Sequence, residues 1–567
     1  MSSDAPMNVV LCWHMHQPEY RDLDTGMVHL PWTYLHAIKD YVDMAAHLEA
    51  VPEARAVVNF TPVLLEQIQS YIEQIEAYLA GRGVIRDPVL AELAEPALPS
   101  NPDALLRLMR DCLRVNPERV IARFPAYQRL ANMARWYEQH PESLIYCTGQ
   151  FPADLLVWYH LGWIAESVRR SDVRIRELQN KEYNFSLHDR RELLGVILEL
   201  LQSVVPRYRA LAEQGRVELS VSPYAHPIVP LLLDMTCAKE AMPDVQLPVN
   251  TQYPGGEERV RWHLQRGLEV FEKFFHCKPR GLWPSEGGVS QQAIELFPQY
   301  GFEWAASGGG VLSQSHESDN GACQHRIFRF GEADIDCIFR DDGLSDLIGF
   351  TYSDWDAGDA VADLVSHLEN VAAACPDRNN CVVSIILDGE NAWEYYPENG
   401  YAFLSELYRA LTEHPQLKLT TFSEFRDECS PEPIHESRLT AGSWVYGTFS
   451  TWIGDPDKNR GWEMLVEAKH SFDARVASGS LGEEALARAE HQLAMCESSD
   501  WFWWFGDYNP SETVVHFDQL YRMHLAHLYN SIDVIAPAHL GNIISRGHGH
   551  PERGGVMRKH SENPGTG

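Results

Sequence analysis

Short runs of apolar, β-branched residues recur along the chain, and segments with helical spacing separate them. The apolar runs cover residues 7–13, 56–60, 217–221, 281–284, 304–307, 381–387 and 418–421. The helical segments between them include 63–79, 192–214, 258–275 and 360–374. Strands that are apolar throughout and alternate with helices are typical of a parallel sheet covered by helices on both faces. The sequence therefore predicts an α/β barrel, whose active site would lie at the carboxyl ends of the strands.

The pattern changes at about residue 430, where apolar strands stop and helical spacing continues over 480–496 and 511–535. A chain of 567 residues is also too long for a single core. We expect a catalytic barrel with helical insertions over 1–430 and a helical domain over 431–545 that contributes to the active site. The polar, Gly- and Pro-rich residues 546–567 are expected to form a flexible tail.

Charge and cysteine usage narrow the possible partners and the compartment. The chain has 47 basic and 80 acidic side chains, a formal net charge of −33, which disfavours nucleic acid and anionic membranes as partners. A neutral carbohydrate is compatible with this charge, although the charge does not select it. The 11 cysteines are scattered without a CxxC pair, and the chain starts without a basic, apolar leader. No apolar run is long enough to span a membrane, so we expect a soluble, cytoplasmic protein; the oligomeric state is not predicted.

Two carboxylates stand directly after predicted strands. Glu286 follows the Gly-Leu-Trp-Pro-Ser segment 281–285 and precedes two glycines, and Asp388 follows the apolar run 381–387. Glycosidic bond cleavage needs such a pair, in which one carboxyl group protonates the leaving oxygen and the other attacks the sugar or activates water. Most acidic residues are simply solvated, but the strand-end positions favour Glu286 and Asp388 as catalytic groups.

Histidines follow two of the strands. His14 and His16 are two residues apart, so on an extended strand they face the same way. From this spacing alone, three roles stay open: zinc ligand, contact to a sugar hydroxyl, and buried structural histidine. His226 precedes a proline and lies just past the strand that holds Glu218, where a fixed, extended backbone could direct it into a pocket.

Two further segments carry charged and aromatic side chains. Arg340 follows an apolar pair and could either stabilise a nucleophilic carboxylate or form a salt bridge at the rim. Residues 497–507 place five aromatic side chains between acids, including Trp501 next to Asp500. These rings could stack on sugars or attach the helical domain to the barrel.

In these segments the chain resembles glycoside hydrolase family 57, whose members act on α-glucans and have an incomplete (β/α)7 barrel. All five short signature regions of that family have a candidate here in the right order: 14–18, 215–227, 281–286, 387–391 and 497–504. The resemblance covers most of the chain, from His14 to about Asp507. Segments 388–394, 441–444 and 500–504 look most like the amylopullulanase and α-amylase branch, although a long C-terminal extension is missing.

The resemblance implies a retaining glycosidase that acts on starch, glycogen, maltodextrins or pullulan, with Glu286 as nucleophile and Asp388 as acid/base. It implies no cofactor and no catalytic metal, and the two carboxyl groups should be about 5–6 Å apart. Residues expected to contact substrate are His14, His16, Glu218, His226, Trp283, Arg340, Glu390, Trp393, Trp444, Asp500 and Trp501. Burial or a neighbouring carboxylate is expected to raise the pKa of Asp388, and Glu390 is the nearest such carboxylate in the sequence. The alternatives are a 4-α-glucanotransferase, a branching enzyme or, more remotely, a metal-dependent deacetylase- or mannosidase-like enzyme with His14 and His16 as ligands.

Overall fold

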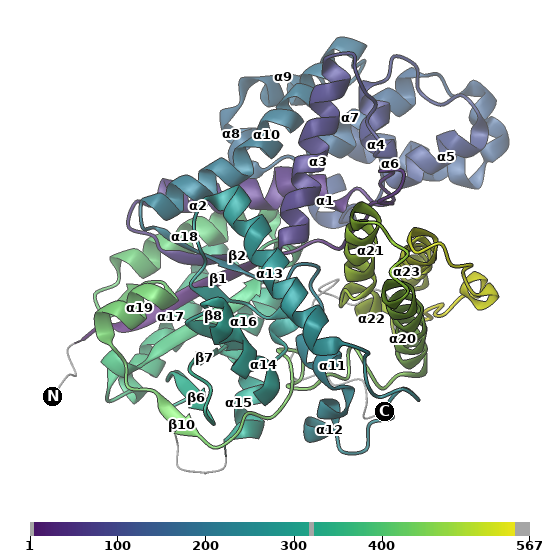
Figure 1. Cartoon of the computed structure of the whole chain (residues 1–567). Coiled ribbons are helices and arrows are strands. Elements are labelled where there is room, and N and C mark those ends of the chain that lie inside the picture. Colours follow the sequence, from purple (N-terminus) through teal and green to yellow (C-terminus); the bar gives the residue numbers. More distant parts are fainter. Residues whose placement is uncertain (1–4, 317–322, 550–567) are drawn as a thin grey trace.

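A curled, mixed, ten-stranded sheet forms the centre of the computed structural model, which describes residues 5–316 and 323–549 (Figure 1). The strands are β1 (Met7–Met15), β2 (Ala56–Phe60), β3 (Val217–Val221), β4 (Gly281–Leu282), β5 (Trp304–Ser307), β6 (Phe328–Phe330), β7 (Asp336–Phe339), β8 (Val382–Asp388), β9 (Leu417–Leu419) and β10 (Ile434–Glu436). Every residue of β1 and β2 is buried, which is typical of a parallel sheet covered on both faces.

The sheet curls into an incomplete barrel, which confirms the expected fold class. The strand order is β10-β6-β7-β5-β4-β3-β2-β1-β8, with β9 beside the first residues of β1. From β7 to β8 this path consists of parallel strands, whereas β6 runs antiparallel to β7. Among the described residues no strand ladder joins β7 to β8. The two ends meet through isolated bonds instead: the Asp341 amide donates to the Ser384 carbonyl at 2.8 Å, and Arg340 Nε donates to the Ile386 carbonyl at 2.7 Å.

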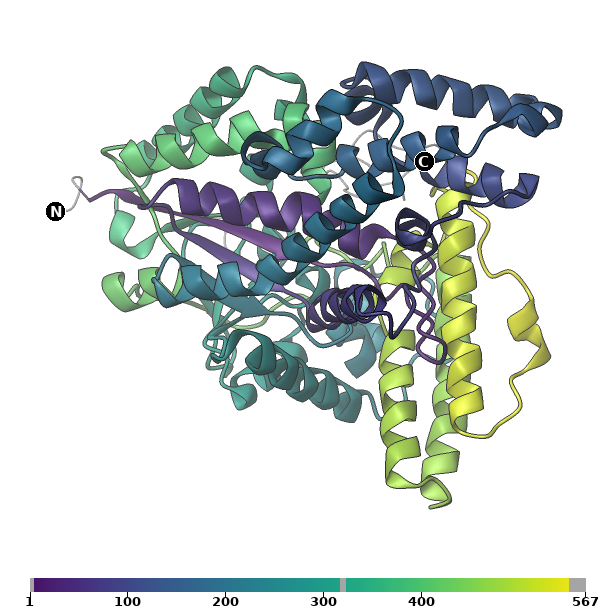
Figure 2. The same ribbon diagram turned by 90° about the horizontal axis from the view of Figure 1, so that it is seen from above.

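Helices cover the barrel and extend it in two directions (Figures 1 and 2). Those packed around the sheet are α1 (Trp32–His36), α2 (Val42–Ala50), α11 (Val229–Leu233), α12 (Ala238–Ala241), α13 (Gly256–Phe275), α14 (Gln291–Leu296), α15 (Gly309–Ser315), α16 (Asp342–Asp346), α17 (Ala357–Ala374), α18 (Tyr401–Glu413) and α19 (Phe422–Cys429). A large insertion between β2 and β3 contains α3 (Pro62–Leu79), α4 (Pro88–Ala94), α5 (Pro102–Asp111), α6 (Pro125–Gln139), α7 (Gln150–Gly162), α8 (Glu166–Ser171), α9 (Val173–Lys181) and α10 (Leu187–Glu213). The C-terminal helices are α20 (Pro456–Ala477), α21 (Glu483–Cys496), α22 (Asp500–Trp504) and α23 (Ser511–Ser531).

A buried carboxylate attaches the C-terminal helices to the barrel. Glu497, just after α21, accepts from Tyr253 at 2.6 Å and is paired with Arg259 at 2.8 Å and with His263 at 2.7 Å. Burial by itself would raise the pKa of Glu497, but Arg259 and His263 lower it to about 2. A buried charge is tolerated only when it is paired in this way, so the contact fixes where the helical region lies.

Pairing with the barrel strands continues past residue 430. Strand β10 still pairs with β6, and Gly442 bridges to Val289 beside β4, so the chain remains part of the barrel well beyond residue 430. Of the expected tail, residues 546–549 lie against 507–510 through hydrogen bonds of His548 and Gly549, and the rest lies outside the described residues. None of the described helices is both long enough and apolar enough to cross a membrane.

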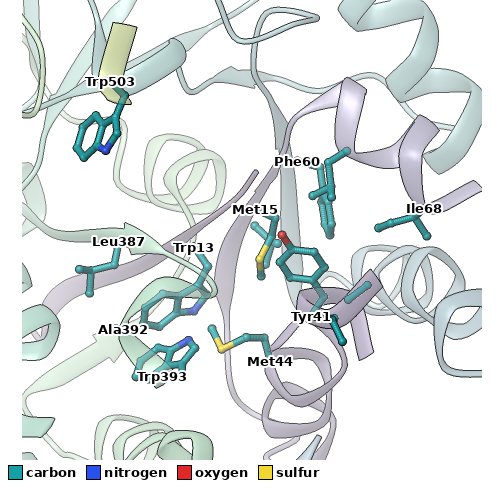
Figure 3. Close-up of a cluster of buried hydrophobic side chains, with 14 of the residues drawn as sticks. Trp13, Met15, Tyr41, Met44, Phe60, Ile68, Leu387, Ala392, Trp393 and Trp503 are labelled. Carbon is teal, nitrogen blue, oxygen red and sulfur yellow. The ribbon is translucent and has the colours of Figure 1, made fainter. Parts of the chain in front are cut away.

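The core beneath the carboxyl ends of β1 and β8 is aromatic (Figure 3). Trp13 of β1 packs edge-to-face on Trp393 with 5.7 Å between ring centroids, and Trp13 Nε1 donates to Tyr408 at 2.8 Å. Met44 and Leu387 lie against the same cluster. Because interiors are close-packed, this cluster gives the strand ends above it a rigid base.

Candidate active site

The carboxyl ends of three central strands are level with one another. His14 of β1 is in register with Asn59 of β2 on one side and with Asp388 of β8 on the other. This edge opens into a cleft of about 1250 Å³, above the range of about 300–1,000 Å³ that is usual for small-ligand pockets. The sequence-predicted residues that line the cleft are His14, His16, Glu286, Arg340, Asp388, Glu390, Trp444 and Asp500.

Glu286 lies in a tight turn directly after β4. Its backbone is left-handed, with φ at +57°, a conformation that costs a non-glycine residue about 1–3 kcal/mol and is concentrated at functional sites. The Trp444 amide donates to the Glu286 carbonyl at 3.1 Å, and Trp444 Nε1 donates to Glu286 Oε2, also at 3.1 Å. Burial and the nearby charges of Asp388 and Asp500 raise the pKa of Glu286 well above its ordinary value. The turn therefore presents to the cleft a carboxyl group that is held by an indole donor.

Asp388 ends β8 on the opposite side of the β1 strand end. Asn391 Nδ2 donates to Asp388 Oδ2 at 2.9 Å, which leaves Oδ1 as the oxygen that can hold a proton toward the cleft. Burial raises the pKa of Asp388, while Asn391, His16 and Arg340 favour its ionised form.

Glu390 does not have the role expected of it. Burial and the charge of Asp388 raise the pKa of Glu390 itself, whereas Glu390 is not among the groups that raise the pKa of Asp388. Its Oε1 accepts from the His16 amide at 3.3 Å and from Gln17 at 3.2 Å. Burial, rather than Glu390, is therefore what raises the pKa of Asp388.

The three histidines form a stack beside the carboxyl groups. His16 and His226 lie face to face with 4.0 Å between ring centroids, and His14 is 5.1 Å from His226. His14 Nδ1 bonds Asn59 Oδ1 at 2.7 Å, and His226 Nδ1 bonds Ser499 at 2.9 Å. Burial and the neighbouring His16 lower the pKa of His14 to about 3, and burial lowers the pKa of His226 strongly as well. His14 and His226 are therefore neutral at physiological pH.

The C-terminal helices supply a carboxylate to this group. Asp500, the first residue of α22, accepts from His16 Nε2 at 2.9 Å and from Ser498 at 2.6 Å. Asp500 therefore brings the start of α22 to the cleft. Arg340 approaches from the other side, where its guanidinium lies 5.7 Å from the centre of the Trp444 ring and pairs with Asp342 at 2.8 Å and with Asp346 at 2.9 Å.

Five of the expected substrate contacts do not line the cleft. Trp283, Trp393 and Trp501 are at most 1% exposed. Trp393 Nε1 donates to the Gly389 carbonyl, and Trp501 Nε1 donates to the Met495 carbonyl. His226 lies behind His16, with which it stacks. These four residues support the site from beneath, since close packing leaves no face open to substrate.

Glu218 is the clearest correction. It lies on β3 in register with Val57, two residues before Ser220, so it is on the same face as the site but deeper in the barrel. There it accepts from Trp304 Nε1 at 2.8 Å and from the Ser423 amide at 2.8 Å. Its role is to join neighbouring parts of the barrel floor.

Several residues of the site were not expected from the sequence. Asn59, Thr61 and Ser499 position the histidines, and Asn391 positions Asp388. The cleft is also lined by Arg119 and Trp163 of the insertion and by Trp503, Trp504 and Tyr508 of the C-terminal region. Trp32 of α1 and Tyr395, which follows β8, complete its aromatic lining. Asn59 and Thr61 stand at the end of a predicted strand, so strand-end polarity could have identified them. Residues of the insertion carry no such local signal.

A metal site within the cleft would use a different set from the one expected. The ligand atoms of His16, His226 and Asp500 all lie within 4.8 Å of one another. His14 is not part of this set. Two histidines and a carboxylate are a donor set that zinc accepts, although here His16 already bonds Asp500 and His226 already bonds Ser499.

The sequence profile of glycosyl hydrolase family 57 matches residues 10–437, which is most of the chain. The chain belongs to this family. Four of the five expected signature segments fall within the matched range, and the segment 497–504 lies beyond it. None of the curated proteins compared with the chain matches it.

Several solved structures share the fold. The GH57-type branching enzyme from Pyrococcus horikoshii is 16% identical, with a TM-score of 0.56, over 95% of this chain and 94% of that one. The α-amylase AmyC from Thermotoga maritima is 13% identical, with a TM-score of 0.55, over 93% of both chains. The 4-α-glucanotransferase from Thermococcus litoralis is 13% identical, with a TM-score of 0.50, over 93% of this chain and 60% of that one. The similarity includes the C-terminal helices but does not separate the branches of the family.

Proposed function

We propose that this protein is a retaining glycosidase that acts on α-glucans, with Glu286 as the nucleophile and Asp388 as the acid/base. The observation that carries the proposal is the convergence of these two partly buried carboxyl groups on one large cleft. Family membership supports the reaction class. The enzymes that share its fold are described as a branching enzyme, an α-amylase and a glucanotransferase, which supports an α-glucan as the substrate.

The protonation of the pair suits double displacement. Two neighbouring carboxyl groups that are partly withdrawn from water do not both ionise readily, so the pair retains one proton at working pH. Trp444 Nε1 can only donate, so it stabilises the ionised form of Glu286. Asp388 keeps Oδ1 free to hold the proton, because Asn391 bonds its other oxygen.

The reaction then follows in two steps. Glu286 attacks the anomeric carbon to form a glycosyl ester, while Asp388 gives its proton to the departing glycosidic oxygen. Asp388 next takes a proton from water or from an acceptor sugar hydroxyl, which attacks the same carbon and releases Glu286. Two inversions retain the α configuration, and the distance between the carboxyl groups is expected to be about 5–6 Å.

The acid/base variant Asp388→Asn tests the assignment of both residues. α-Maltosyl fluoride needs no acid to leave, so the first step should still proceed and the slow second step should let the ester accumulate. Intact and peptide mass spectrometry should then find one maltosyl group on the peptide that contains Glu286, and none in the Glu286→Gln variant. Glu218→Gln, which changes a carboxylate on the barrel floor, is the control and should turn over normally.

The stereochemistry of the product provides an independent check. Proton NMR of the first-formed product from maltoheptaose should show the α anomer. A β anomer, or a maltosyl adduct on a different residue, would contradict the proposed mechanism.

The choice of acceptor is a separate question. We favour hydrolysis, as expected for the amylopullulanase and α-amylase branch. Chromatography of products from maltoheptaose and pullulan distinguishes the outcomes: short maltooligosaccharides mean hydrolysis, longer or branched chains mean transfer, and maltotriose from pullulan means α-1,6 cleavage.

A further inference from the structure

Three thiols and one imidazole come close together among residues that do not line the cleft. Cys381 comes directly before β8, Cys375 directly follows α17, and Cys323 and His325 precede β6. The three sulfur atoms lie within 4.8 Å of one another, and Cys323 Sγ is 3.4 Å from His325 Nδ1. Cys375, Cys381 and His325 are buried, at 6%, 2% and 7% exposure. Buried thiols brought together with an imidazole nitrogen are the usual donor set of structural zinc sites.

Two of the donor–donor distances can be compared with tetrahedral ligation, whereas His325 does not belong to the set whose ligand atoms all lie within 4.8 Å of one another, so its ring would have to move toward Cys375 and Cys381 on binding. With Zn–S at about 2.3 Å and Zn–N at about 2.0–2.1 Å, tetrahedral angles separate two sulfurs by about 3.8 Å and a sulfur from a nitrogen by about 3.6 Å. The 3.4 Å between Cys323 Sγ and His325 Nδ1 fits the second value. Cys375 Sγ and Cys381 Sγ are 2.9 Å apart, so a small rotation of one side chain is needed to reach the first value.

The imidazole is oriented from behind by a carboxylate. His325 Nε2 bonds Asp341 Oδ2 at 2.8 Å, which directs Nδ1 toward the thiols. Gln324 Nε2 donates to the same carboxylate oxygen at 3.1 Å. Metal-ligating histidines almost always bond a carboxylate or carbonyl through their second nitrogen, and this partner fixes the tautomer and the ring orientation.

A disulfide between Cys375 and Cys381 is the alternative explanation for the short distance between their sulfur atoms. A disulfide bond measures about 2.05 Å and involves two thiols only, and all the cysteines in the structure are free. It would not account for the third thiol, for His325 Nδ1 beside that thiol, or for the carboxylate behind the imidazole. The cluster of three thiols, with an oriented imidazole beside one of them, favours a metal.

We propose that Cys323, His325, Cys375 and Cys381 bind one structural Zn²⁺ ion. Binding would release the three thiol protons and give a site closed by four protein ligands. The position of the site in the fold indicates a structural role, because the site lies where β7 and β8 meet without a strand ladder. The His325 carbonyl accepts from the Val382 amide at 2.7 Å, and Asp341 lies between Arg340 of the cleft and α16. The ion would therefore hold together the open seam of the barrel.

The experiment measures metal in the intact, full-length protein purified under reducing conditions without chelators. Elemental analysis should find one zinc per chain, and zinc should be lost in Cys375→Ser and in His325→Ala. Cys237→Ser, which removes a buried thiol outside the cluster, should keep its zinc. Asp341→Asn should weaken zinc affinity about 10- to 100-fold in competition with a chromophoric chelator.

Two further measurements separate loss of this zinc site from misfolding of a variant and from metal bound in the cleft. Cobalt substitution of the wild-type protein should give intense thiolate-to-cobalt absorption, which reports sulfur ligation even if a variant fails to fold. His226→Ala should keep its zinc; zinc that is lost there but retained in Cys375→Ser would assign the metal to the cleft and overturn the proposal. Absence of zinc after reconstitution with zinc chloride, together with a Cys375–Cys381 disulfide found by peptide mapping, would overturn it in favour of the disulfide.

Discussion

Replacing Trp444 with phenylalanine should move the acidic limb of the pH–rate profile to higher pH. The substitution removes the Nε1–H donor to Glu286 Oε2, at 3.1 Å, and keeps an aromatic ring between Trp283 and Arg340. A hydrogen bond to a charged group contributes about 1.5–3 kcal/mol, and one pKa unit corresponds to about 1.4 kcal/mol. Losing a donor to the carboxylate destabilises its ionised form, so the pKa of Glu286 should rise by about 1–2 units.

The assay is kcat/KM for maltoheptaose as a function of pH. On the acidic limb, Trp444→Phe should lose about 10- to 100-fold relative to wild type, and the difference should shrink as pH rises and Glu286 ionises in both proteins. Trp304→Phe is the matched control, since it removes an indole donor to the carboxylate of Glu218 on the barrel floor. An unshifted limb in folded Trp444→Phe, or an equal shift in Trp304→Phe, would refute the reasoning that Trp444 tunes the nucleophile.

Three other substitutions give separate expectations. Glu497 has a folded pKa of about 2, so its pairing stabilises the fold above the unfolded pKa near 4.3, and this stabilisation is lost as pH falls toward 2. Glu497→Gln should therefore lower the free energy of unfolding by about 3 kcal/mol at pH 7, measured by urea unfolding, and should make that free energy less dependent on pH in the acidic range. Glu390 has a raised folded pKa, so the free energy of unfolding should decline as pH rises above about 4.3 and the unfolded chain loses this proton first. In Glu390→Gln this decline should be smaller, by up to about 1.4 kcal/mol per pH unit. Trp504 lines the cleft at the end of α22, and Trp504→Ala should raise KM for maltoheptaose about 2- to 10-fold by loss of ring stacking, with less effect on maltotriose. An unchanged pH dependence of stability in either glutamate variant, or an equal KM change for both sugars, would contradict the corresponding expectation.

Local sequence was sufficient to place the strands and the two carboxyl groups at their ends. The apolar runs before Asp388 and around Val57 became β8 and β2, because a strand buried on both faces must be apolar throughout. Glu286 was identifiable because a carboxylate between a Trp-Pro strand end and two glycines indicates a tight turn. These signals lie within a few neighbouring residues, so no long-range information was needed to find them.

How deep a side chain lies within the barrel could not be predicted from local sequence. Glu218 shares its face of β3 with Ser220, and only the register with β2 places it at the floor. Trp283, Trp393 and Trp501 have the composition of sugar-stacking residues, but the packing of neighbouring elements covers both faces of each ring. An aromatic side chain serves a core and a substrate cleft equally well, so sequence alone does not separate these uses.

The sequence by itself determined the alternation of strands and helices, the acidic charge, and the two strand-end carboxyl groups, because each depends on residues close together in the chain. The tertiary structure decided which groups surround that pair. It brought Asp500 to His16 across 484 positions, and it gathered Cys323, Cys375 and Cys381 without any local motif. The pKa of Glu286, the walls of the cleft and the proposed zinc ligands depend on such distant contacts, and these form only when the barrel curls and the C-terminal helices pack against it.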